Sequence, residues 1–128
     1  MNSVAQAKME LRVGMSEGKT ATVIGASTPG GMGAATARRL RREGARVVVS
    51  GLGEQLRQEL AQEIDGLAFE AAITSKQANV DLVNFTLETY GQIDLAVNHM
   101  GLATRSPISQ ETEEYLQLMT EVNCFGTY

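Results

Sequence analysis

From residue 20 onward, the chain alternates short β-branched or apolar runs with longer amphipathic runs. The short runs predict strands at residues 20–24, 46–50, 67–73 and 93–97. The longer runs predict helices at 34–43, after Gly53, at 76–90, and from about residue 111 to 128. A regular alternation of strand and helix is typical of an α/β fold, in which a parallel sheet carries helices on both faces.

Apolar spacing in the helical runs indicates a shared apolar stripe on each helix. Ala37 and Leu40 are expected inward in the first helix, and the stripes are Leu56, Leu60 and Ile64 in the second, Val80, Val83, Leu87 and Tyr90 in the third, and Tyr115, Leu118, Met119 and Val122 in the fourth. Gly44 and Gly91 stand where helix ends are expected, since glycine readily adopts the left-handed conformation that terminates a helix.

Length and composition predict one domain. The 128 residues divide into a lead-in at 1–19, broken by glycines, and a domain at 20–128. Apolar residues make up 43% of the chain and charged residues 20%, as in ordinary globular proteins. A net charge of −4 argues against nucleic-acid binding. With no long apolar run and no secretory leader, the sequence predicts a cytoplasmic protein without a membrane partner.

The single cysteine, Cys124, excludes an internal disulfide and a cysteine-based metal cluster. We therefore expect no metal site.

The segment 25–33, Gly-Ala-Ser-Thr-Pro-Gly-Gly-Met-Gly, lies between the first predicted strand and the first predicted helix. Glycines in this place let the backbone turn tightly and let a pyrophosphate approach the amides at the helix amino end. The helix dipole favours the negative charge of the phosphate there. The segment therefore predicts a nucleotide site.

Three features together resemble the short-chain dehydrogenase/reductase family. Residues 25–33 are similar to that family's phosphate loop, and Asn98-His99-Met100-Gly101 resembles its Asn-Asn-Ala-Gly motif. The preceding residues 90–97 have the family's typical form. Asn123, twenty-five residues past Asn98, stands where the family carries an active-site asparagine. The features occur in the expected order and span 20–128.

The resemblance implies a Rossmann-type doubly wound parallel sheet in three α/β/α layers, with strand order 3-2-1-4. It implies NAD or NADP as cofactor and hydride transfer between the nicotinamide and an alcohol or ketone. Asn123 is the implied catalytic residue. The implied cofactor-binding residues are Gly25, Ser27, Gly31, Met32, Gly33, Gly51, Ala72, Ile73, Asn98, His99, Gly101 and Val122.

Several positions depart from the family pattern. The glycine loop is two residues longer than usual, and Ile24 replaces the threonine that precedes it. Gly51 stands where an NAD-preferring member carries an acidic residue, and Leu52 adds no cation for a 2′-phosphate. Ala72 replaces the aspartate that commonly meets the adenine. The choice between NAD and NADP stays open.

The family's acid/base pair, a tyrosine with a lysine four residues later, does not occur in this chain. Lysines stand only at 8, 19 and 76, and tyrosines at 90, 115 and 128. The chain by itself is therefore expected to be inactive, as the cofactor-binding half of an enzyme truncated before that pair. The alternative is a non-catalytic, degenerate subunit or fragment of the same fold. A methyltransferase-like Rossmann domain is a third reading, which leaves Asn98, Gly101 and Asn123 unexplained.

The last predicted helix also suggests assembly. In the resembled family this helix commonly packs against its twin in a neighbouring subunit. Here it carries Leu116 and Phe125 in addition to its inward face. Such an apolar surface, beside a free strand edge, predicts a homo- or hetero-oligomer.

Overall fold

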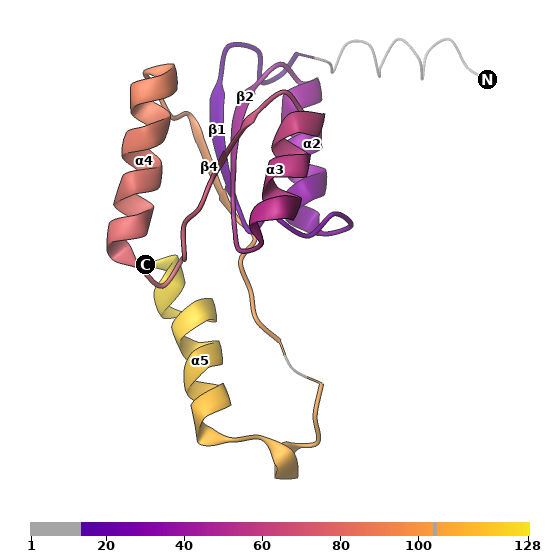
Figure 1. The fold of residues 1–128 in the computed structure, drawn as a ribbon, viewed down its shortest axis with the longest axis vertical. Helices are drawn as coiled ribbons and strands as arrows, with labels where there is room; N and C mark the ends of the chain where they lie inside the picture. The colour runs from indigo at the N-terminus through magenta and orange to yellow at the C-terminus, as the bar shows by residue number, and fades with distance from the viewer. Residues whose placement is uncertain (1–13, 104) are drawn as a thin grey trace, which may run out of the picture.

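The computed structural model describes residues 14–103 and 105–128. Its four strands form one parallel sheet in the order β3-β2-β1-β4 (Figure 1). The strands are β1 (Thr20–Ile24), β2 (Arg46–Ser50), β3 (Leu67–Phe69) and β4 (Leu95–Asn98). The helices are α2 (Met32–Arg42), α3 (Glu54–Glu63), α4 (Lys76–Tyr90) and α5 (Glu113–Asn123). Helices α2 and α3 cover one face of the sheet and α4 the other, which confirms the predicted doubly wound fold and strand order.

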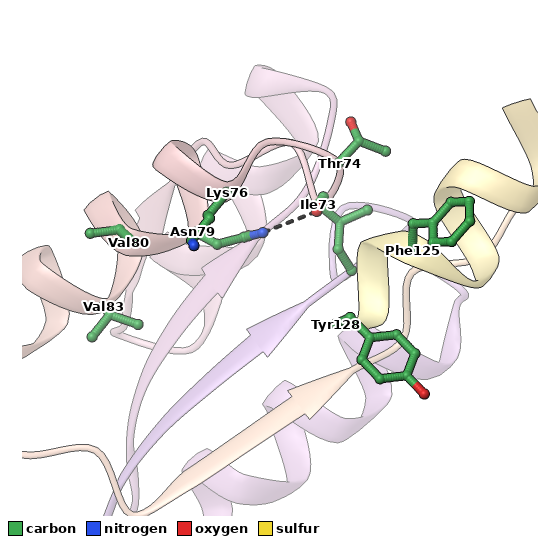
Figure 2. A pocket seen from close by; sticks show the side chains of 8 residues that line it. All are labelled: Ile73, Thr74, Lys76, Asn79, Val80, Val83, Phe125 and Tyr128. Atoms are coloured by element: carbon green, nitrogen blue, oxygen red, sulfur yellow. Dashed lines mark hydrogen bonds between the residues drawn. The ribbon is translucent and has the colours of Figure 1, made fainter.

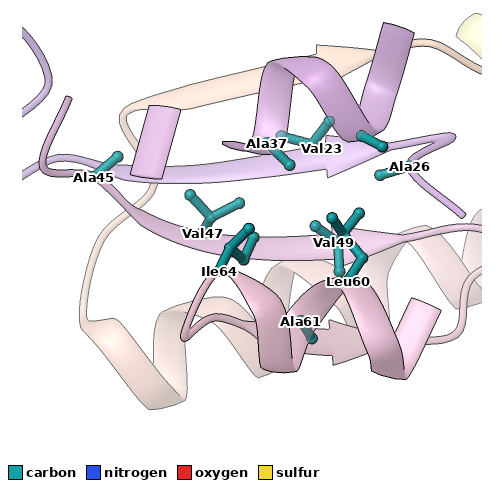
Figure 3. Packing of buried hydrophobic residues seen from close by; sticks show 10 residues of the cluster. Val23, Ala26, Ala37, Ala45, Val47, Val49, Leu60, Ala61 and Ile64 are labelled. Carbon is teal, nitrogen blue, oxygen red and sulfur yellow. The ribbon is translucent and has the colours of Figure 1, made fainter. Parts of the chain in front are cut away.

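The consecutive valines of β2 divide the core into two layers. Side chains alternate between the faces of a strand, so Val47 and Val49 face α2 and α3 while Val48 faces α4. All three are 0% exposed. Figure 3 shows Val47 and Val49 packed against Leu60 and its neighbours on α3. A run of β-branched residues in a central strand is thus buried on both sides, as expected for a parallel sheet.

Glycines end two of the helices as predicted. Gly44 follows the last residues of α2 with φ of +91°, and Gly91 caps α4 with φ of +78°. Both are left-handed conformations that glycine adopts without strain. Ala37 of α2 is fully buried, in agreement with its predicted inward position.

Strand β3 is shorter than the predicted run of 67–73. It pairs with β2 through Leu67, Ala68 and Phe69, and Phe69 lies opposite Ser50, the last residue of β2. Beyond that point β2 offers no further partner, because the chain turns at Gly51. Residues 70–73 therefore leave the sheet.

The apolar stripe predicted for α4 does not face the sheet. Val80, Val83 and Leu87 are 42–43% exposed, whereas Leu82 and Thr86 of the same helix are buried. Tyr90 of that stripe is half-buried in the cluster around Val48. The helix carries two apolar stripes, and the sheet buries the one that contains Leu82 rather than the one that contains Val83.

Helix α5 is also shorter than predicted. A single-turn 3-10 helix at Ile108–Gln110 precedes it, and another at Phe125–Thr127 follows it. In Figure 1 α5 extends beyond the sheet, below α4, and none of its residues is buried. Leu116 and Phe125 are 60% and 69% exposed. The apolar surface expected of this segment is therefore present and open.

Residues 1–13 of the predicted lead-in lie outside the described residues. Residues 14–18 form turns that lie against the end of α2, where the Met15 and Ser16 amides both donate to Glu43, at N···O distances of 3.2 and 3.0 Å. Within the part of the chain that the structure describes, no helix is both long and apolar enough to cross a bilayer.

Asp94 joins the beginnings of β1 and β4. Its Oδ2 accepts from the Thr20 N–H at 2.8 Å and from Gln92 Nε2 at 2.7 Å, and Lys19 Nζ lies 3.5 Å from its Oδ1. The Thr20 hydrogen bond is the main cause of a lowered Asp94 pKa, with smaller contributions from Gln92 and Lys19. The ionised carboxylate is thus stabilised in the folded state.

We expect Asp94→Asn to flatten the acid limb of the stability curve. A lowered folded-state pKa stabilises the protein above the unfolded value of about 3.9, and this stabilisation is lost as the pH falls through the folded value. Urea unfolding measured from pH 7 down to pH 3 should show a smaller loss of stability in the variant than in the wild type. Asp81→Asn is the control, since Asp81 bonds only within its helix, to Gln77. Parallel curves for wild type and Asp94→Asn would contradict the prediction.

Candidate functional site

The predicted phosphate loop begins where β1 ends at the carboxyl edge of the sheet. Gly25 has φ of +81°, a conformation that favours glycine. The N–H groups of Gly25 and Ala26 both donate to the Ser50 carbonyl at the end of β2, at N···O distances of 2.8 and 3.1 Å. The loop is therefore anchored to the neighbouring strand before it reaches α2.

Two glycines allow three backbone segments to meet at this point. A Cβ on Gly33 would lie 2.2 Å from the Gly25 carbonyl oxygen. A Cβ on Gly25 would lie 2.6 Å from the His99 carbonyl carbon and from the Met100 nitrogen. Neither distance is possible for a real side chain, so only glycine lets α2, the loop and the end of β4 pack together.

The amino end of α2 has no cap other than backbone. Gly31 is the N-cap residue, it offers no side-chain hydrogen bond, and the first turn holds no acidic residue. The first amides of a helix lack partners within the helix, and the helix dipole adds partial positive charge. An uncapped end beside a glycine turn is suited to a phosphate group.

The end of β2 lies against the same loop. A Cβ on Gly51 would lie 2.9 Å from the Ser27 hydroxyl oxygen, so the missing side chain at Gly51 lets Ser27 approach. Leu52, the next residue, is 59% exposed. The first residues after β2 thus present a bare backbone at Gly51 and an apolar side chain at Leu52.

Arg57 was not identified from the sequence, yet it is the one basic side chain buried in this region. It is 3% exposed, and its Nη1 donates to the Gly51 carbonyl at 2.6 Å. Its Nη2 lies 3.2 Å from Glu70 Oε2. Arg57 stands three residues before Leu60 on the inward face of α3, and that spacing was the available signal. It holds the turn after β2 in place.

Three arginines of α2 form ion pairs. Arg38 binds Glu63 of α3 through two contacts of 2.7 Å and also donates to the Pro29 carbonyl at 2.9 Å. The Arg38 hydrogen bonds lower the pKa of the Glu63 carboxyl. Arg39 and Arg41 pair with Glu43 and Asp65. These three guanidinium groups are therefore engaged with carboxylates on the protein.

The residues after β4 bind back to the sheet and to α2. The His99 N–H donates to the Ile24 carbonyl at 2.8 Å, and Asn98 Oδ1 accepts from the Met100 N–H at 2.8 Å. The His99 Nε2 lies 2.9 Å from the Thr36 hydroxyl oxygen on α2. This short segment is thus fixed on both sides of the strand end.

Asn123, the predicted catalytic asparagine, binds the backbone of the same loop farther along. Its Oδ1 accepts from the Leu102 N–H and its Nδ2 donates to the Leu102 carbonyl, both at 2.8 Å. A Cβ on Gly101 would lie 3.6 Å from its Oδ1. The side chain ties the end of α5 to the loop that follows β4, and Val122 beside it is half-buried.

Contacts gather the predicted residues into three groups. The first joins the glycine loop to the ends of β2 and β4, through Gly25, Ser27, Gly33, Gly51 and His99. The second joins Gly101 to Asn123. The third is Ile73, which packs against Gly126 after α5. Met32 and Ala72 are exposed.

A cavity lies elsewhere, between α4 and the turn that follows α5 (Figure 2). Its volume is about 420 Å³, and Val80 and Val83 line one side while Phe125 and Tyr128 line the other. Of the predicted site residues it includes Ile73 alone. Among residues 14–103 and 105–128, no three His, Cys, Asp or Glu side chains gather as metal ligands would.

Comparison with known proteins identifies the family. The family model described as enoyl-(acyl carrier protein) reductase matches residues 25–128. The chain is 32% identical to a diacetyl reductase of Staphylococcus epidermidis over 114 residues, which cover 85% of this chain and 44% of the relative. It is 34% identical to a sorbitol dehydrogenase of Cereibacter sphaeroides, over 87% of this chain and 43% of the relative.

The structure also matches a solved protein of the same kind. A short chain dehydrogenase from Mycobacterium smegmatis superposes with a TM-score of 0.82 and 31% identity, over 89% of this chain and 49% of that chain. The chain therefore spans about half the length of the relatives it matches. These matches and the fold agree, and the chain belongs to the short-chain dehydrogenase/reductase family of oxidoreductases.

Proposed function

We propose that this chain is the cofactor-binding part of an NAD(P)-dependent oxidoreductase that acts on an alcohol or ketone. A bound nicotinamide supplies the hydride chemistry in such enzymes, and the protein supplies binding and orientation. Relatives named diacetyl reductase, borneol dehydrogenase and sorbitol dehydrogenase support a substrate of this class.

The observation that carries the proposal is the uncapped amino end of α2 beside Gly25 and Gly33. At Gly25 and Gly33 there is no room for even one methyl group, so the backbone lies open at the positive end of α2. The first turn of this helix holds no acidic residue, and such a site fits a pyrophosphate. We propose that the amides of residues 31–33 hold the phosphates and that Ser27 and Gly51 contact the adenosine ribose. Ala72, Ile73 and Val122 would line the adenine, and Asn98, His99 and Gly101 would lie toward the nicotinamide.

We assign no proton-transfer step to the residues of this chain. Asn123 is proposed to position the loop after β4 through Leu102, near the place where the substrate would lie. The tyrosine and lysine that move the proton in this family have no counterpart in these 128 residues. The chain by itself is therefore proposed to bind cofactor without turning over substrate.

We expect Met32→Glu to weaken NADH binding by about tenfold, because one carboxylate near the pyrophosphate costs about 1.4 kcal/mol. Met32 is the first residue of α2 and is 73% exposed, so the substitution creates no clash. An acidic residue in this turn should leave helix stability unchanged or slightly higher. Met32→Gln is the control of equal size, and its affinity should match that of the wild type. Fluorescence titration with NADH and NADPH gives the dissociation constants, and urea unfolding gives the stability.

Equal affinities for Met32→Glu and Met32→Gln would mean that the phosphates do not bind at this helix end. Failure of the wild type to bind either nucleotide would favour the alternative function, a non-catalytic subunit of the same fold. The altered positions Ile24, Gly51 and Ala72 support that alternative.

Self-association or association with a related chain is also part of this proposal. Leu116, Leu118 and Phe125 are at least 44% exposed on α5 and the turn after it. The partner would be a second copy of the chain or a homologous subunit.

A further inference from the structure

The sole histidine of the chain links the two strand ends of the proposed nucleotide site to α2. His99 follows β4, and its Nε2 lies 2.9 Å from the Thr36 hydroxyl oxygen, 63 residues away in sequence. Its N–H donates to the Ile24 carbonyl at the end of β1. One residue thus contacts β1 through its backbone and α2 through its side chain.

The position of Thr36 explains why this link affects the phosphate loop. Thr36 lies three residues after Gly33, so both residues occupy one face of α2. Gly33 is the residue that packs on the Gly25 carbonyl, and Gly25 in turn packs on the backbone of His99 and Met100. The Thr36–His99 hydrogen bond therefore closes a ring of contacts around Gly25.

The Thr36 hydroxyl behaves differently from other helical threonines in this structure. Thr86, Thr89 and Thr120 each donate to the carbonyl four residues earlier in their own helix, at an O···O distance of 2.8 Å. Thr36 bonds instead to a side chain from another element. The Thr36 hydroxyl therefore joins α2 to the loop after β4, two segments that are otherwise connected through the contacts of Gly25 and Gly33.

We propose that His99 is a positioning residue, which with Thr36 fixes the distance between the amino end of α2 and the loop after β4. The proposal rests on the proposed function, because these two segments would hold opposite ends of the cofactor. Removal of the link leaves the fold intact and loosens the site. Both the hydroxyl and the imidazole nitrogen can serve as donor or acceptor, so the bond can form with either neutral tautomer or with the protonated ring.

The experiment uses the 128-residue protein with Thr36→Val, Thr36→Ser, His99→Ala and the Thr36→Val/His99→Ala double variant. Valine keeps the shape of threonine and loses the hydroxyl, whereas serine keeps the hydroxyl. Thr89→Val is the matched control, because it removes a helical hydroxyl on α4 whose bond lies within its own helix.

NADH titration should show dissociation constants raised about threefold to tenfold in Thr36→Val and in His99→Ala, as for loss of one net hydrogen bond. The double variant should bind NADH no more weakly than the single variant with the higher dissociation constant, because both changes remove the same hydrogen bond. Thr36→Ser should restore wild-type affinity, and Thr89→Val should leave it unchanged. Additive effects in the double variant, or unchanged affinity in Thr36→Val, would overturn the proposal.

A second measurement is independent of cofactor. Because His99 is the only histidine, its imidazole ¹⁵N resonances are assigned without ambiguity. Thr36→Val should shift the Nε2 resonance, and Thr36→Ser should return it to the wild-type position. Unchanged resonances in Thr36→Val would overturn the hydrogen bond itself. A wild type that shows the bond but binds no nucleotide would overturn the proposed function, and with it the positioning role.

Discussion

Gly33→Ala is expected to destabilise the protein by at least about 2–3 kcal/mol, toward the upper end of the usual cost of overpacking. Helix propensity alone predicts the opposite sign, because alanine is favoured over glycine in a helix by about 1 kcal/mol. The steric term decides the outcome. The new Cβ would lie 2.2 Å from the Gly25 carbonyl oxygen and 2.9 Å from the Ala26 Cα, and both are backbone atoms.

Neither side of this contact can yield easily. Gly25 is hydrogen-bonded to Ser50 on β2 and packs against His99 on its other side. Helix α2 would have to move away from the sheet, which would separate Ala34 and Ala37 from the core cluster that they share with Val23. The amino end of the helix would move with it, so NADH affinity is expected to fall together with stability.

Gly30→Ala is the matched control for this prediction. Gly30 lies in the same loop, and a Cβ there would have no heavy atom within 4 Å. Its substitution should change the free energy of unfolding by no more than about 0.5 kcal/mol, as for other surface positions. Urea unfolding and NADH titration of both variants provide the test. A Gly33→Ala protein as stable as Gly30→Ala would contradict the packing described here.

Leu60→Ala is expected to cost about 2–4 kcal/mol of stability, the range for deletion of a large buried side chain. Leu60 is 5% exposed and packs in the cluster between α3 and the sheet, beside Val49 (Figure 3). Its neighbours in this cluster are valines on strands of the sheet and alanines with small side chains, and neither can move far to fill the cavity left by the truncation. The cost therefore includes a cavity as well as the lost burial.

Leu56→Ala is the matched control, because it makes the same side-chain truncation one turn earlier on α3. Leu56 is 41% exposed, so its truncation should cost less than about 1 kcal/mol. Both leucines belong to the stripe predicted from four-residue spacing, and they differ in how deeply their side chains are buried. Urea unfolding of the two variants gives the difference directly, and equal costs would show that burial does not separate them.

The positions of the strands and helices were largely predictable from residue order. Three consecutive valines in 46–50 require burial on both faces, and only a central strand with helices on both sides provides it. The place of the glycine loop between the first strand and the first helix followed from the alternation, and the strand order followed from the family resemblance. The roles of the individual site residues stay predictions, to be tested by the experiments above.

The length of β3 depended on its neighbour. Residues 70–73 were predicted as part of this strand, but pairing ends at Phe69 because β2 ends opposite it, at Ser50. A strand needs a partner for its backbone groups, and the sequence of the strand itself does not contain that information. The burial of Arg57 has a similar origin, because the Gly51 carbonyl that receives its guanidinium belongs to the turn after β2.

Residue order by itself predicted the succession of strands and helices, the glycine loop and the resemblance to the family, because periodicity and turn chemistry are local properties of the chain. Tertiary structure alone decided which stripe of α4 is buried, since Leu82 and Val83 are equally apolar and only the sheet distinguishes them. It alone brought Thr36 to His99 and Asn123 to Leu102. Such contacts depend on how elements distant in sequence pack together. The spacing of residues along one element does not predict which residues of another element they will contact.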